Sequence, residues 1–155
     1  MNGLARVLDE GQLLEQMAGF VRTAMSALAP GLDKTLVGTV DFLGEQVSVF
    51  TANGENVRTP RENGGLGIIA FTMGGNFYAG DPPGIYAPLC AENEVVLHNL
   101  LSPDDFLATL IHELVERYMM KTFRLTYDVA HSSFAEPIEQ LARRAMKTPG
   151  WSWAA

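Results

Sequence analysis

The segment Ser102–Lys121, SPDDFLATLIHELVERYMMK, combines a helix-start signal with residue types that bind metals. Ser102 supplies a capping hydroxyl, Pro103 suits the first helical position, and two acids follow in the first turn. Apolar residues then recur at helical spacing. We therefore expect one amphipathic helix that runs from this cap to about Lys121.

Polar side chains interrupt the apolar run of this helix. Because each residue turns an α-helix by about 100°, His112 and Glu116 project side by side from the border of the apolar face. An imidazole and a carboxylate at this spacing can chelate one divalent ion, since the helix fixes both donors in advance. Glu113 points about 100° away from His112, so it can miss the metal and still reach a metal-bound water as a general base. This is the arrangement of the H-E-x-x-H metallohydrolase helix, with Glu116 replacing the second histidine.

A catalytic zinc usually has three protein ligands and one open position, so another donor is needed. His131, in the segment YDVAHSSFAEPIEQ (residues 127–140), is the best candidate, because it lies on the next predicted helix after a short connection. Asp128 comes one turn earlier and can cap that helix or accept the second ring proton of His131. Glu139 comes two turns later and can serve as a fourth ligand or as an outer hydrogen-bond partner.

The two quoted segments resemble a pattern of small uncharacterised phage and prophage proteins: H-E-L-x-E-x-x-x-M, then Y-x-x-A-H, then a glutamate about eight residues later. More distantly, they resemble the active-site helix of zincin-type metallopeptidases, from which Glu116 departs. The similarity covers about residues 102–142. It implies a metal-dependent peptidase or hydrolase that uses zinc or another divalent metal, with Glu113 as the base and His112, Glu116 and His131 as ligands.

Ordinary structural roles compete with this interpretation. Glu113 and Arg117 have the i, i+4 spacing of a surface ion pair. A histidine at the edge of an apolar face, taken alone, is more often a hydrogen-bonded core residue than a ligand. The metal hypothesis depends on a pairing instead: two of the three histidines, His112 and His131, lie beside acids on consecutive predicted helices.

Alternating and β-branched residues in the middle of the chain predict a small sheet. Residues 35–52 form two such runs around Gly44 and should make a β-hairpin. Residues 65–73 and 93–100 are expected to add a third and a fourth strand, and segments rich in turn formers flank the third as loops. We expect a mostly antiparallel sheet.

Further helices are expected on both sides of these strands. An N-terminal helix is predicted over residues 10–29. A last helix should begin near Thr126 or Asp128 and reach about Lys147, with Pro137 kinking or dividing it. These elements predict an α+β fold with an N-terminal helix, a small mostly antiparallel sheet, and two C-terminal helices that carry a zincin-like site.

The composition limits the class of protein. A length of 155 residues and a hydrophobic content of 47% fit a single domain over residues 1–155, with a tail at about 148–155. A net charge of −7 without a basic stripe argues against nucleic-acid binding. Cys90 is the only cysteine, which excludes an internal disulfide and a cysteine zinc cluster. Without a secretory leader or a run of about 18 uncharged apolar residues, we expect a soluble cytoplasmic protein that does not use membranes.

The residues favour hydrolysis of an amide, with a peptide or protein as substrate. The metal would polarise the carbonyl while Glu113 takes a proton from the bound water. Tyr127 or His98 would steady the oxyanion, although His98 also suits a loop hydrogen-bond network. An exposed strand within residues 66–73 would align an extended peptide. The alternatives are a non-catalytic phage accessory or binding protein, whose metal only fastens two helices, and a metal-free helical pair; no oligomeric state is indicated.

Overall fold

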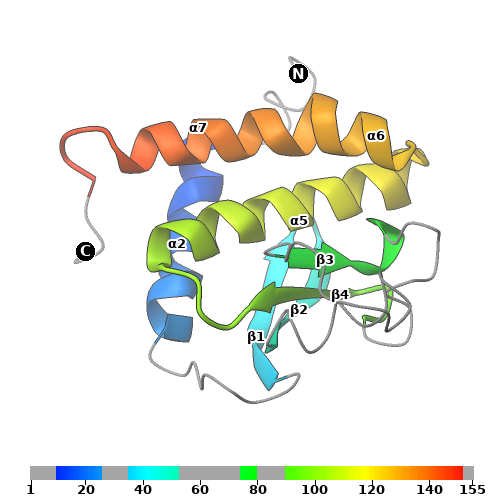
Figure 1. Cartoon of the computed structure of the whole chain (residues 1–155), viewed down its shortest axis with the longest axis horizontal. Helices are drawn as coiled ribbons and strands as arrows, with labels where there is room; N and C mark the ends of the chain where they lie inside the picture. Colours follow the sequence, from blue (N-terminus) through cyan, green and yellow to red (C-terminus); the bar gives the residue numbers. More distant parts are fainter. Residues whose placement is uncertain (1–9, 26–34, 53–73, 80–89, 152–155) are drawn as a thin grey trace, which may run out of the picture. The chain divides into compact units, whose positions relative to one another are not determined.

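The computed structural model describes residues 10–25, 35–52, 74–79 and 90–151. Figure 1 shows the elements along the chain. The contacts within the chain divide it into two compact units. The helical unit joins residues 1–26 to residues 102–155, and the sheet unit comprises residues 27–101. The single domain over residues 1–155 stays a prediction.

The sheet unit contains a four-stranded mixed sheet in the order β1-β2-β4-β3. Its strands are β1 (Thr35–Phe42), β2 (Glu45–Ala52), β3 (Gly74–Asn76) and β4 (Glu94–His98), and the short 3-10 helix η1 (Phe77–Ala79) follows β3. β1 pairs with β2 and β3 pairs with β4 in antiparallel fashion, whereas β2 and β4 are parallel. The predicted α+β class is confirmed, and the parallel pairing makes the sheet mixed.

The predicted hairpin is confirmed, and its turn explains the close pairing of β1 with β2. Phe42 pairs with Glu45, so only two residues connect the strands. Leu43 and Gly44 both have positive φ, 52° and 87°, as a type I′ turn requires. The backbone N–H of Gly44 donates to Oδ1 of Asp41 at 3.0 Å. This turn matches the natural twist of the two strands.

A short strand lies in a segment that was predicted to be a loop. The expected strand at residues 65–73 falls outside the described residues. The described strand β3 begins at Gly74, in a segment that was expected to be a loop. That expectation was wrong for Gly74–Asn76, because three residues that begin with two glycines show no alternation and owe their extended form to pairing with β4.

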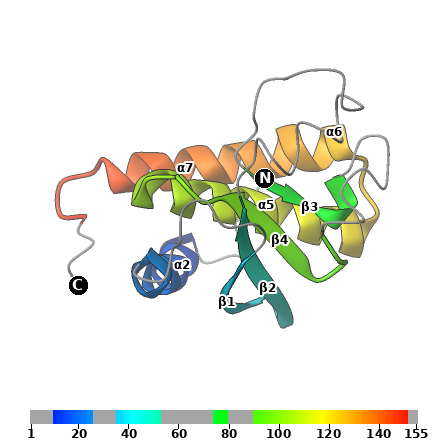
Figure 2. The ribbon, with the colours of Figure 1, turned by 60° about the horizontal axis from the view of Figure 1, so that its bottom comes forward.

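The helical unit is built around its longest described helix, α5. Its elements are α2 (Glu10–Met25), α5 (Pro103–Phe123), α6 (Tyr127–Val129), the π-helical segment η2 (Ala130–Ala135) and α7 (Glu136–Met146). α2, η2 and α7 all contact α5. Figures 1 and 2 both show α7 running alongside α5. No described helix is both long and apolar enough to cross a membrane.

Helix α5 begins as predicted but is more deeply buried than its pattern indicated. Oγ of Ser102 accepts a hydrogen bond from the backbone N–H of Asp105 at 3.2 Å, which confirms the cap. Every residue from Phe106 through Arg117 is buried. The expected polar border of the helix is therefore inside the structure, and its ionisable side chains are shielded from water.

The last helical stretch is divided next to Pro137, as predicted. Thr126 caps it, since its Oγ1 accepts from the N–H of Val129 at 3.4 Å. The π-helical residues follow, and the N–H of Glu136 bonds to the carbonyl of His131, five residues back. Pro137 has no N–H to continue the helical ladder, and α7 begins at this point. The alternative cap, Asp128, is excluded.

Candidate metal centre

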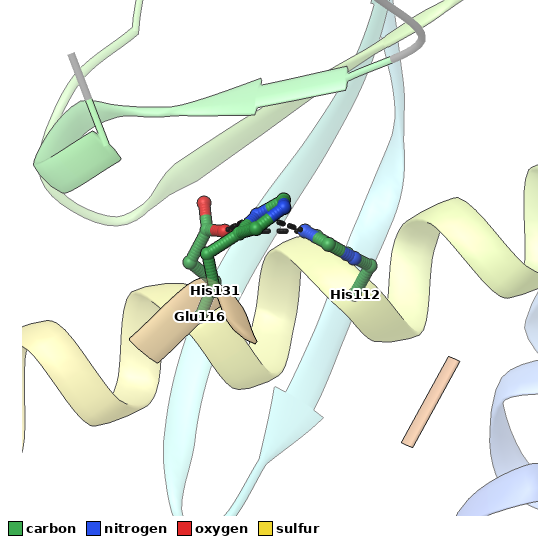
Figure 3. A group of neighbouring side chains, drawn as sticks. All are labelled: His112, Glu116 and His131. Atoms are coloured by element: carbon green, nitrogen blue, oxygen red, sulfur yellow. Dashed lines mark hydrogen bonds and ion pairs between the residues drawn. The ribbon is translucent and has the colours of Figure 1, made fainter. Parts of the chain in front are cut away.

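Three side chains of the helical unit converge on one point. His112 and Glu116 lie one turn apart on α5, and His131 comes from η2, which packs against α5. Nε2 of His112 is 3.1 Å from Oε2 of Glu116 and 3.1 Å from Nδ1 of His131, and Nδ1 is 2.8 Å from the same Oε2. Figure 3 shows the two rings and the carboxylate turned toward one another. The group lies close enough to bind a metal ion.

Two carboxylates outside this triangle fix the protons of the histidines. Nδ1 of His112 is 2.7 Å from Oε1 of Glu139, and Nε2 of His131 is 3.0 Å from Oε1 of Glu136. An ionised carboxylate only accepts, so each ring donates its outer N–H, and the inner nitrogen can offer a lone pair once a metal takes the place of any proton there. Two nitrogen lone pairs and one carboxylate oxygen then face one another. A single cation satisfies all three.

The triangle has dimensions suited to a small divalent cation. Ligand atoms about 2.0–2.1 Å from zinc, at angles of about 90–110°, lie about 2.9–3.4 Å apart. Two of the observed separations, both 3.1 Å, lie within this range, and the third, 2.8 Å, is just below it. Only the pair formed by Glu116 and His131 would have to move apart, by about a tenth of an ångström, to admit the ion.

Protons take the place of the cation when it is absent. Burial disfavours the charged ring of His112, but hydrogen bonds with Glu116 and Glu139 and the charge of Glu113 outweigh burial and raise its pKa to about 10. The metal-free protein therefore holds His112 as an imidazolium at neutral pH. A metal ion must displace that proton in order to bind.

Glu113 lies beside the triangle without belonging to it. Its Oε2 is 4.0 Å from Nε2 of His112, and its side chain is buried. This distance suits a group that contacts a ligand of the metal rather than the metal itself. Glu113 and Arg117 are both buried, so a pairing between them would not be the surface ion pair that their spacing suggested.

Glu139 connects His112 to a second ion pair. Its Oε2 accepts from Nε of Arg143 at 2.8 Å, and Nη1 of Arg143 donates to Oδ1 of Asp105 at 2.8 Å. Burial opposes the charge of Glu139, but its hydrogen bonds with His112 and Arg143 prevail and lower its pKa. Because Oε1 contacts the outer nitrogen of His112, Glu139 is an outer partner in this geometry and not a fourth ligand.

The remaining candidates have different positions. Asp128 is exposed and makes no hydrogen bond or ion pair with the described part of the chain, so Glu136 is the partner of His131 that the sequence did not reveal. The hydroxyl of Tyr127 is 3.3 Å from Nδ1 of His131, and the two rings stack with centroids 5.0 Å apart. His98 ends strand β4 in the sheet unit and is not part of the metal-binding group.

Comparisons with known proteins add no family to this picture. No protein-family model matches the chain, and neither a curated protein nor a solved structure does. The resemblance to phage proteins and to zincins stays a prediction. Any function must therefore be argued from the geometry of the helical unit.

Proposed function

We propose that this protein is a metal-dependent hydrolase that uses zinc or a similar divalent ion. The proposal is supported by one observation above all: three ligand atoms, Nε2 of His112, Oε2 of Glu116 and Nδ1 of His131, lie within 3.1 Å of one another. Imidazole nitrogen and carboxylate oxygen together suit zinc among the common divalent ions. Three protein ligands leave room in the coordination sphere for water and substrate.

Glu113 is the general base of the proposed reaction. A bound zinc ion supplies Lewis acidity, which polarises a carbonyl and acidifies water. Glu113 takes the proton of the attacking water and then donates it to the leaving group. Its Oε2, 4.0 Å from Nε2 of His112, lies within one water molecule of the ligand triangle. Its burial supports this role, because exclusion of bulk water strengthens the electrostatic interactions within a site.

The proposed substrate is an amide, with a peptide as its simplest form. Substrate would approach on the side of His131, whose side chain is 28% exposed, whereas that of Glu116 is only 2% exposed. Tyr127 belongs to the same side, since its hydroxyl lies 3.3 Å from Nδ1 of His131. A phenol there can donate a hydrogen bond to the oxyanion that develops during attack. The strand proposed to align the peptide, residues 66–73, lies outside the described residues.

A structural metal site is the second candidate function. The three ligands come from α5 and η2, so a cation would cross-link two helical elements. His112 and Glu116 are also buried, as in closed structural sites. On this hypothesis the protein is a non-catalytic binding or accessory protein, which binds zinc and hydrolyses no substrate.

Replacing Glu113 by Gln separates the two candidates. Untagged protein is analysed for bound metal by mass spectrometry and for hydrolysis of a quenched fluorescent peptide library. For an enzyme, Glu113→Gln keeps its metal and loses about 10²–10⁴-fold in rate, whereas His112→Ala loses both metal and rate. Zinc-loaded wild type that melts higher but cleaves no peptide would support the structural role. Wild type that binds no divalent metal would refute both.

A further inference from the structure

We infer that Glu136 is the positioning residue for His131, a role that rests on the proposed metal centre. Two links join these residues: Oε1 of Glu136 is 3.0 Å from Nε2 of His131, and the backbone N–H of Glu136 bonds to the carbonyl of His131. The carboxylate therefore sets the orientation of the ring from a backbone that is itself tied to the same residue. Outer carboxylates of this kind fix the tautomer of a metal-binding histidine and raise its basicity.

The π-helical segment makes this pairing possible. In an α-helix, residues five apart are separated by about 140° around the axis, so Glu136 would point away from His131. An i→i+5 hydrogen bond brings residues five apart over one another. His131 lies within the π-helical residues Ala130–Ala135, Glu136 follows this segment directly, and Pro137 comes next. Single π turns of this kind occur frequently at functional sites.

The pairing has a chemical consequence for the metal centre. Glu136 holds the proton on Nε2 of His131, so Nδ1 is the ligand atom. His112 has the opposite arrangement, because Glu139 holds the proton on Nδ1 and leaves Nε2 as the ligand. The two histidines would bind one cation through different ring nitrogens, and nitrogen chemical shifts distinguish these two forms.

The two outer carboxylates differ in their surroundings. The side chain of Glu139 is 19% exposed and is held by Arg143, whereas that of Glu136 is 54% exposed. Loss of an outer partner typically weakens metal binding about 10–100-fold. Because water competes with the Glu136 hydrogen bond, we expect its loss to weaken zinc binding about tenfold, the lower end of that range.

The test compares Glu136→Ala with Asp128→Asn in the full chain. The control removes a negative charge three residues before His131, where the side chain is exposed and forms no hydrogen bond or ion pair with the described residues. Zinc affinity is measured by competition with a chromogenic chelator. We expect about a tenfold loss for Glu136→Ala, a smaller loss for Glu136→Gln, which keeps an acceptor oxygen, and wild-type affinity for the control. Equal affinities for Glu136→Ala and Asp128→Asn would overturn the inference.

Nitrogen-15 spectra of the histidine rings provide a readout that general destabilisation does not move. In zinc-loaded wild type, His131 should carry its proton on Nε2 and bind through Nδ1; binding through Nε2 would overturn the inference. Failure of the proposed function is distinguishable, because wild type would then cleave no peptide, whether or not it takes up zinc, and this does not depend on Glu136. In that case the metal-free protein still tests the inference. It should show a His131 Nε2–H signal that shifts in Glu136→Ala and not in Asp128→Asn. If this shift is absent, Glu136 does not position His131.

Discussion

Zinc affinity should depend steeply on pH, because the metal and a proton compete for Nε2 of His112. The carboxylates around that ring raise its pKa to about 10, despite burial. At pH 7 the ring is therefore about three pH units below its pKa, and the proton weakens apparent zinc binding about 1000-fold, or about 4 kcal/mol. Each unit of pH between 7 and 10 should strengthen binding about tenfold.

The assay is a chelator competition at several pH values, combined with calorimetry in buffers of different ionisation enthalpy. The calorimetric comparison counts protons, and about one proton per zinc should be released from His112 at pH 7.5. Asp128→Asn, which leaves the group intact, should behave as the wild type does. Affinity that does not change between pH 7 and 8.5, with no proton released, would refute the competition and with it the assignment of Nε2 as a ligand atom.

The raised pKa of His112 also predicts how the stability of the metal-free protein depends on pH. A histidine with a pKa raised above 6.5 in the folded state stabilises the fold fully below pH 6.5, and this contribution is lost as pH rises through about 10. Metal-free protein should therefore unfold more readily in denaturant at pH 10 than at pH 6.5. Zinc-loaded protein should show a smaller loss, because the cation replaces the proton.

Three further substitutions test the outer partner, the core and the cap. Glu139→Gln should weaken zinc binding about 10–100-fold by chelator competition, and unchanged affinity would remove Glu139 from the site. Leu114→Ala, on the buried part of α5, should lower the free energy of unfolding by about 2–5 kcal/mol in urea; a loss below about 1 kcal/mol would contradict the packing. Ser102→Ala should cost about 1 kcal/mol through the lost cap, and Ser132→Ala, an exposed serine, should cost less than about 0.5 kcal/mol.

Local patterns predicted the parts of the site that lie within a single element. His112 and Glu116 are one α-helical turn apart, so their alignment follows from helix geometry alone. His131 could be predicted as a ligand because only a short connection leads from α5 to the next helical stretch. The cap at Ser102 and the hairpin around Gly44 were likewise set by a few neighbouring residues.

Features that depend on distant neighbours or on unusual backbone were not predictable in this way. Asp128 was proposed as the partner of His131 because the helix was assumed to be regular, whereas the π-helical segment brings Glu136 there instead. The parallel pairing of β2 with β4 joins strands far apart in sequence, and no local pattern encodes such a register. The burial of α5 on every side was missed for the same reason, since periodicity identifies an apolar face but not what covers the opposite one.

The burial of ionisable groups on α5 is itself an argument for a cation. His112, Glu113, Glu116 and Arg117 all lie in the buried stretch of one helix. Burying charges is costly, and apolar residues of similar size would often give a more stable helix. Glu113 and Glu116 both lie within 4.0 Å of Nε2 of His112, so a cation in the ligand triangle would lie among carboxylates that favour positive charge. Without the ion, a proton on His112 supplies part of this balance, so the raised pKa of His112 and the capacity for metal have the same electrostatic cause.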